Sequence, residues 1–145
     1  MKLPFSRLCA WLVAALVTGV LASLVQTHLS LTALTRLGAN IPASLWLRTL
    51  GEDVLRFAPV MMAAAAGALL PGLLVARAAT GRWRGAWTAL TAATALGTVF
   101  WLMISVIPMP PIAGLRTVGG LLAMASSGLV GGAVYAVLTL SLIHI

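Results

Sequence analysis

Four stretches of this chain are each long and apolar enough to cross a lipid bilayer as a helix. Spanning the hydrocarbon core takes about 20 predominantly apolar residues in helical form. The stretches cover residues 8–34, 57–76, 86–107 and 117–143. Because they occupy most of the 145 residues, the sequence predicts an all-α membrane protein. A single transmembrane domain over residues 1–145 is expected, built as a bundle of four transmembrane helices.

Charge and composition support this class and exclude others. The chain is 61% hydrophobic and only 8% charged, against roughly 25% charged residues in soluble domains. Its net charge of +7 does not indicate a nucleic-acid partner, because most basic residues stand singly at the ends of the apolar stretches. The expected surrounding is the lipid bilayer. The single cysteine, Cys9, excludes a disulfide within the chain and a thiolate metal cage.

The two ends of the chain leave alternatives open. Lys2 and Arg7 precede an apolar core and Ala22 suits signal peptidase, so the first stretch fits a cleaved signal peptide as well as a retained span. We favour the retained span, because apolar residues continue as far as Leu31. Residues 141–145 (SLIHI) resemble translated sequencing-adapter sequence, so we expect the natural C-terminus to be missing.

Basic residues predict the topology, since Lys and Arg in short loops favour the cytoplasm. With the N-terminus inside, five basic residues lie on the cytoplasmic side and four on the other. These are Lys2, Arg7, Arg77, Arg82 and Arg84 inside, and Arg36, Arg48, Arg56 and Arg116 outside. We expect both termini in the cytoplasm. The arginines between residues 77 and 84 either only fix this topology or also contact anionic lipid.

The connection between the first two spans predicts a short amphipathic helix over residues 42–56. Gly38 suits the C-terminal cap of the preceding helix, and Pro42 suits the first turn of the new one. Apolar residues recur through the segment at helical spacing and form one face. We expect this helix to lie on the outer membrane surface, with Trp46 at the level of the lipid headgroups.

A polar rim near the outer end of the bundle is the candidate binding site. Its members are Gln26, His28, Arg48, Glu52, Asp53, Arg56 and Arg116. His28 with Glu52 or Asp53 would suit a proton-handling or metal-binding pair, because imidazole and carboxylate are suitable ligands. The favoured alternative is an ordinary rim in which arginines pair with acids three and four residues away. We expect no metal and no other cofactor.

Small residues predict how the helices pack, because close backbone approach drives helix association in lipid. The last span carries Gly119, Ala123, Ser127 and Gly131 at intervals of four, with Gly128 and Gly132 beside them. Either all of these residues pack inside one bundle, or one of the two stripes serves a partner. That partner would be a second copy of the chain or another membrane protein.

The inventory of reactive side chains predicts that the chain is not an enzyme. It contains no HExxH motif, no cysteine pair, and no serine with a recognisable His-plus-acid motif. The leading hypothesis is therefore an accessory or assembly protein that interacts through its small-residue helix faces and its outer amphipathic segment. The alternative is a small oligomeric transporter or channel, with a polar path along the threonines of the third span to His28 and Gln26.

Two segments resemble a known group of proteins. Residues 37–48 (LGANIPASLWLR) and 111–120 (PIAGLRTVGG) are similar to a group of small bacterial inner-membrane proteins. The group shares the length and the four-span layout, so the resemblance covers nearly the whole chain. It implies a location in the bacterial inner membrane. No activity is established for the group, so the resemblance carries over no functional residue.

Overall fold

The computed structural model describes residues 3–76, 78, 83–107 and 112–141, with the side chains of 6–76, 78, 83–107 and 112–139. Within these residues the chain forms α-helices and one 3-10 helix, and no strand. The elements are α1 (Leu3–Arg36), α2 (Ala43–Arg56), α3 (Ala58–Ala76), α4 (Arg84–Val106), η1 (Ala113–Arg116) and α5 (Val118–Ser141). The predicted fold class is confirmed. Arg77, Arg82, the prolines at 108, 110 and 111, and the last residues of the fourth predicted span lie outside the described residues.

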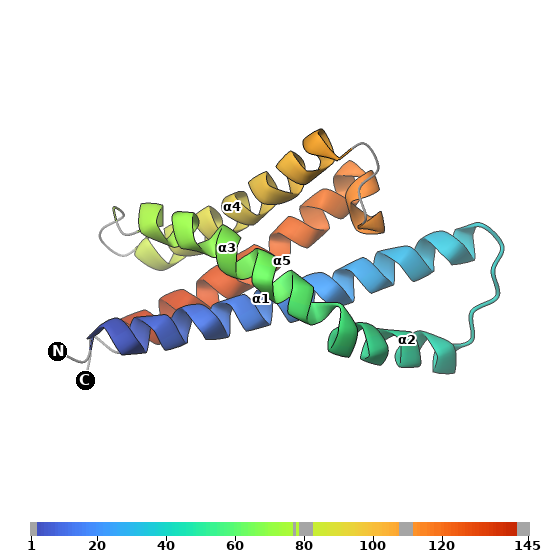
Figure 1. Cartoon of the computed structure of the whole chain (residues 1–145), viewed down its shortest axis with the longest axis horizontal. Helices are drawn as coiled ribbons and strands as arrows, with labels where there is room; N and C mark the ends of the chain where they lie inside the picture. The colour runs from blue at the N-terminus through green and yellow to red at the C-terminus, as the bar shows by residue number, and fades with distance from the viewer. Residues whose placement is uncertain (1–2, 77, 79–82, 108–111, 142–145) are drawn as a thin grey trace.

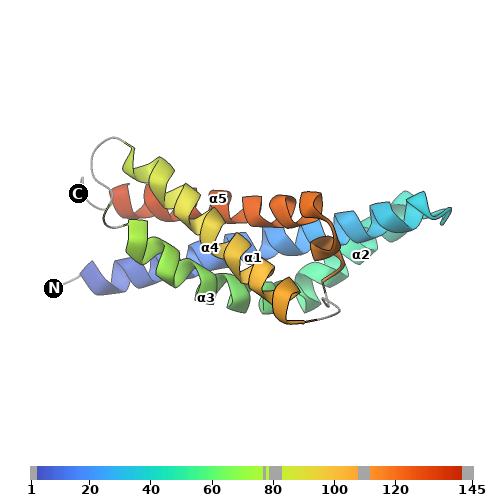
Figure 2. The same cartoon turned by 90° about the horizontal axis from the view of Figure 1, so that it is seen from above.

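The four long helices form a closed ring in the order α1, α3, α4, α5, in which each packs against its two neighbours. Figures 1 and 2 show α1 and α5 running along the long axis, with α3 and α4 crossing them at an angle. Four of the helices, α1, α3, α4 and α5, are long and apolar enough to span a membrane. The chain is therefore built as a multi-pass membrane protein.

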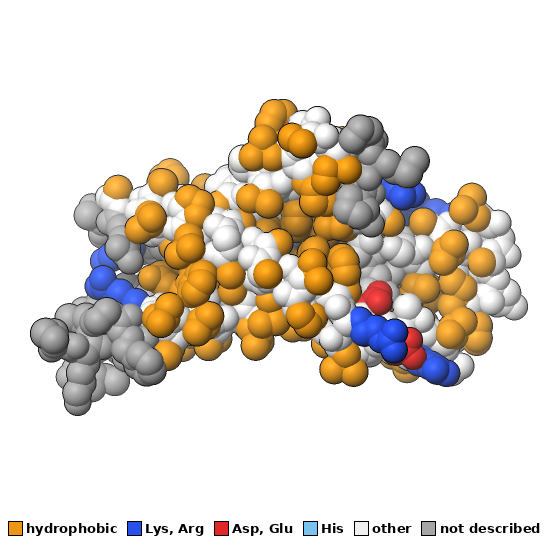
Figure 3. Space-filling view, in the orientation of Figure 1, with side chains coloured by type: hydrophobic (Ala, Val, Ile, Leu, Met, Phe, Trp, Pro, Cys, Tyr) orange, Lys and Arg blue, Asp and Glu red, His pale blue; other side chains and the backbone are white. Residues whose placement is uncertain are grey.

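The interior of the ring contains two apolar clusters. One cluster is centred on Phe100, Leu96 and Met124, and the other on Leu69 and Ala14, all of which are almost completely buried. Large apolar side chains cover much of the outside, as Figure 3 shows. An apolar exterior suits a lipid environment, where such side chains need not be hidden from solvent.

The amphipathic helix α2 begins and ends within a residue of the predicted bounds. Gly38, at φ 92°, ends α1 and turns the chain. Pro42 then directly precedes α2. Figures 1 and 2 show α2 running back along the C-terminal half of α1, not across the end of the bundle. A hairpin of helices results, and we call the end of the molecule that carries α2 and η1 the hairpin end.

The length of α1 explains why this hairpin projects. At 1.5 Å per residue, its 34 residues span about 51 Å, well beyond the roughly 30 Å of a hydrocarbon core. The chain passes from α2 into α3 through Phe57 alone. Pro59 falls in the first turn of α3, where its missing N–H has no helical partner to lose.

Candidate functional site

Gln26, a member of the predicted rim, is a buried structural link. Its side chain is 9% exposed, and its Oε1 accepts a hydrogen bond from the backbone N–H of Gly114 at 2.7 Å. A Cβ on Gly114 would lie 2.5 Å from that oxygen. Gln26 thus fixes η1 against α1 and satisfies a backbone donor inside the molecule. The Nε2 of the same amide donates to Ser30 Oγ at 3.4 Å on α1.

Asp53 performs the same task for α2. Its Oδ2 accepts a hydrogen bond from Thr27 Oγ1 at 2.6 Å, and its backbone carbonyl lies 3.3 Å from Ser23 Oγ. Thr27 and Ser23 are both buried on α1. The carboxylate therefore points inward and attaches α2 to α1. A bond of this kind is stronger than one between neutral groups, because the acceptor is charged.

The predicted pairing of His28 with an acid has no counterpart in these contacts. The His28 ring packs against Trp46 of α2, with ring centroids 5.6 Å apart. Asp53 bonds to Thr27, and Glu52 bonds to Arg48. No group of three His, Cys, Asp or Glu side chains suited to a metal ion occurs among the described residues. His28 and Trp46 instead add an aromatic contact between the two helices of the hairpin.

Arg48 and Glu52 form an exposed ion pair on the outward face of α2. Arg48 Nε donates to Glu52 Oε1 at 2.8 Å. The hydrogen bond and the charge of Arg48 hold the pKa of Glu52 below its ordinary value, and Arg56 adds to this effect. The same pair raises the pKa of Arg48. Arg56 and Arg116 are themselves exposed, and Figure 3 shows charged side chains gathered over α2.

The two small-residue stripes of α5 face two different helices. A Cβ on Gly131 would collide with Thr18 Oγ1 of α1. On the neighbouring stripe, a Cβ on Gly132 would lie 2.7 Å from the Cα of Ala89, and one on Gly128 would lie 2.9 Å from the Cα of Ala93, both on α4. Close approach at both stripes is thus used inside the ring.

The other predicted packing residues of α5 differ in burial. Ser127 is buried, and its Oγ donates to the Met124 carbonyl at 2.6 Å. Ala123 is half-buried. A Cβ on Gly119 would meet no atom within 4 Å. The close approaches of α5 glycines to α1 and α4 therefore lie at Gly128, Gly131 and Gly132.

Two further glycines complete the ring. A Cβ on Gly19 of α1 would lie 2.6 Å from the backbone nitrogen of Met62 on α3, and one on Gly72 of α3 would lie 2.8 Å from the carbonyl oxygen of Thr91 on α4. Every seam between neighbouring helices of the ring thus contains a glycine in close contact with the facing helix. Gly72 was not part of the sequence prediction.

The threonine face of α4 points away from the interior. Thr94, Thr98 and Ser105 are exposed, and each hydroxyl donates to a carbonyl of the preceding turn of α4. Hydroxyls in lipid commonly satisfy themselves in this way. Because these hydroxyl-bearing residues face outward, the oligomeric transporter alternative would need a second molecule to supply the other wall of its polar path to Gln26 and His28.

Several contacts that organise the hairpin end were missed by sequence reasoning. The roles of Thr27 and Ser23 as partners of Asp53, and of Gly114 as partner of Gln26, were not predicted. One signal was present, because Ser23, Gln26, Thr27 and Ser30 recur at spacings of three and four and so share one face of α1. A polar face within a span indicates that a neighbouring segment bonds to it.

Together, the ring of apolar helices and the hairpin define the class: a multi-pass helical membrane protein with one projecting amphipathic helix. No family model matches the chain, and no curated protein or solved structure matches it either.

Proposed function

We propose that this protein is a non-enzymatic accessory or assembly protein of the bacterial inner membrane, with both termini in the cytoplasm, which binds another membrane protein through α2. The observation that carries the proposal is the outward face of α2. The helix has no buried residue, and its Leu47 and Leu55 are 70% and 79% exposed. Helices that present an apolar stripe generally bury it against a partner.

The fixed position of α2 supports a protein partner. The bonds of Asp53 and the ring contact of Trp46 hold one face of α2 against α1. The opposite face, with Leu47 and Leu55, is thereby turned away from the bundle. Gly51 lies between the two leucines on this face, with open space where a Cβ would be. Two leucines with a gap between them fit a second helix packed alongside.

Charge indicates the chemistry of that partner. The hairpin end carries four arginines, Arg36, Arg48, Arg56 and Arg116, and all of them are exposed. The same end holds both acids of the chain, but Asp53 points inward and Glu52 is bonded to Arg48. A second copy of this surface would bring like charges together, whereas an acidic segment would be attracted. We therefore propose a partner helix with acidic residues beside its apolar stripe.

Site-specific photocrosslinking in native membranes tests this proposal. A photoreactive side chain at Leu47 or Leu55 should give one discrete adduct with a second membrane protein. The matched control is Leu122 on α5, which is similarly exposed at 63% but lies on a membrane span. Arg56→Glu should abolish the adduct, while Arg116→Glu should leave it largely unchanged. Adducts with lipid alone, or only with a second copy of the chain, would refute the proposal.

A further inference from the structure

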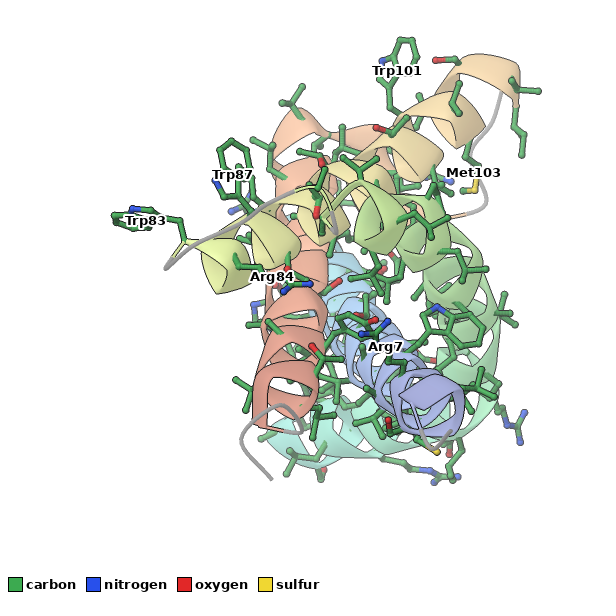
Figure 4. All side chains as sticks on the ribbon, turned by 90° about the vertical axis from the view of Figure 1, so that its left-hand side faces the viewer. Arg7, Trp83, Arg84, Trp87, Trp101 and Met103 are labelled. Carbon is green, nitrogen blue, oxygen red and sulfur yellow. The ribbon has the colours of Figure 1, made fainter. Side chains whose placement is uncertain are left out.

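The end of the ring opposite the hairpin is lined by arginine. Arg7 lies near the start of α1 and Arg84 is the first residue of α4. Figure 4 shows the Arg7 and Arg84 side chains between the ends of the long helices, while Trp83 and Trp87 point away from them. Figure 3 likewise shows basic side chains together at this end of the molecule. We call it the arginine end.

The position of Arg84 follows from the helix period. Thr88 and Ala92 follow it at steps of four and are 6% and 0% exposed, so Arg84 stands on the inward face of α4. The side chain is half-buried. Arg7 precedes Trp11 by four residues, and Trp11 packs against the apolar cluster around Leu69. Arg7 is itself exposed, so the half-buried charge at this end is that of Arg84.

These two charges have no side-chain carboxylate near them. Glu52 and Asp53 are the only acids in the whole sequence, and both lie at the hairpin end. A half-buried charge is costly unless an opposite charge accompanies it. The arginine end therefore favours an anion from outside the chain.

An additional hydrogen-bond donor is present at the same end. The indole Nε1 of Trp11 is buried and has no hydrogen-bond partner among the described residues. This donor lies one helical turn beyond Arg7 and does not make a site without the two arginines.

We propose that the arginine end binds a phosphate group between Arg7 and Arg84. Arginine presents a planar fork of donors that matches the oxygens of a phosphate in pairs. The phosphate would belong to an anionic lipid headgroup or to a free phosphate compound. A hollow of about 360 Å³, lined by Trp83, Ala86, Trp87 and Leu90, lies on the outward face of α4 and not beside the two arginines, so it does not decide between these two sources.

Native mass spectrometry of the full-length protein in detergent tests the lipid arm. Phosphatidylglycerol should remain bound about tenfold more than phosphatidylcholine, as expected for a charge-assisted site. The double variant Arg7→Lys/Arg84→Lys keeps the charge and the topology but loses the planar forks, and it should lose most of this preference. Arg36→Lys/Arg116→Lys at the hairpin end is the matched control and should keep it.

A second arm uses inorganic phosphate alone. Phosphate should raise the melting temperature of the wild type above the effect of chloride at equal ionic strength if a free phosphate compound is the ligand, and not if a lipid is required. Retention of phosphatidylglycerol by the double lysine variant at the wild-type level, with no phosphate effect on melting, would overturn the proposal. The melting temperature of each variant without ligand separates loss of binding from loss of folding.

Discussion

The middle of the bundle and its hairpin end are held together by different interactions. In the middle, glycines let neighbouring helices approach until backbone nearly touches backbone, and shape decides which helices pack. At the hairpin end, directional hydrogen bonds from Gln26 and Asp53 hold η1 and α2 in place. The seams should therefore be sensitive to added volume, whereas the hairpin end should be sensitive to lost polar atoms.

The seam between α1 and α5 is expected to give the largest effect. Gly131→Leu places a side chain against Thr18, which is completely buried and bonded to the carbonyl of Ala14 at 2.7 Å. Because Thr18 lies close to the backbone of α1 and cannot move aside easily, we expect the free energy of unfolding to fall by about 3 kcal/mol. This is the upper part of the usual range for overpacking. Unfolding in mixed detergent micelles, followed by tryptophan fluorescence, measures it. Gly119→Leu, in open space on the same helix, should change the free energy of unfolding little. Equal losses of stability at both positions would contradict the close packing of Gly131 against α1.

A substitution at Gln26 tests the hydrogen bonding of the hairpin end, because it removes a hydrogen-bond acceptor without adding volume. Gln26→Leu keeps an apolar side chain of similar size but leaves the N–H of Gly114 without its acceptor. We expect the free energy of unfolding to fall by about 2 kcal/mol, since an unsatisfied buried donor costs roughly 1–3 kcal/mol. The same unfolding measurement applies. Thr94→Val, at an exposed hydroxyl bonded only to its own helix, should be nearly neutral. A loss of stability comparable to that of Gln26→Leu would show that a bond between segments matters no more than one within a helix.

The contrast between these regions also explains what the sequence could predict. The four spans and α2 were predicted because their apolar lengths and helical spacing are local properties. Gly131 and Gly132 were identified as packing residues because lipid leaves small residues as the main association signal. The stripes alone did not specify which helix each one faces, since that depends on the order of helices around the ring.

The hairpin end was less predictable because its contacts join segments far apart in the sequence. Gln26 and Gly114 are 88 residues apart and Thr27 and Asp53 are 26 apart, and no local pattern encodes such a pairing. Gln26, His28 and Asp53 were therefore grouped as one rim, although the structure gives each a different partner. Of the arginine–acid pairs expected within α2, the one between Arg48 and Glu52 is present, because side chains four residues apart on a helix are neighbours. Asp53, which was expected to pair with an arginine three residues away, instead accepts a hydrogen bond from Thr27.

Asp53 is expected to have a smaller and more local effect than Gln26. Asp53→Ala removes the acceptor of Thr27 and should release α2 from α1, while the ring of four long helices stays intact. A hydrogen bond to a charged group contributes about 1.5–3 kcal/mol, and we expect the lower end because α2 has no buried residue. Hydrogen–deuterium exchange should rise across residues 43–56 and remain unchanged in α5. Glu52→Gln is the neighbouring control, and equally fast exchange in that variant would contradict docking through Asp53.

The ion pair between Arg48 and Glu52 should have the smallest effect on stability. Its contribution is recognised by its dependence on pH. Hydrogen bonding and attraction by Arg48 place the folded-state pKa of Glu52 below the ordinary value of 4.5. The pair therefore stabilises α2 above that pH, and this contribution is lost as the pH falls through the lowered pKa. Both side chains are largely exposed, so water screens the interaction and the effect is slight. Exchange of α2 amides, corrected for the intrinsic effect of pH, should be slower in the wild type than in Glu52→Gln at neutral pH. The two proteins should converge in acid, and a difference that persists below the folded-state pKa would assign the stabilisation to something other than this charge.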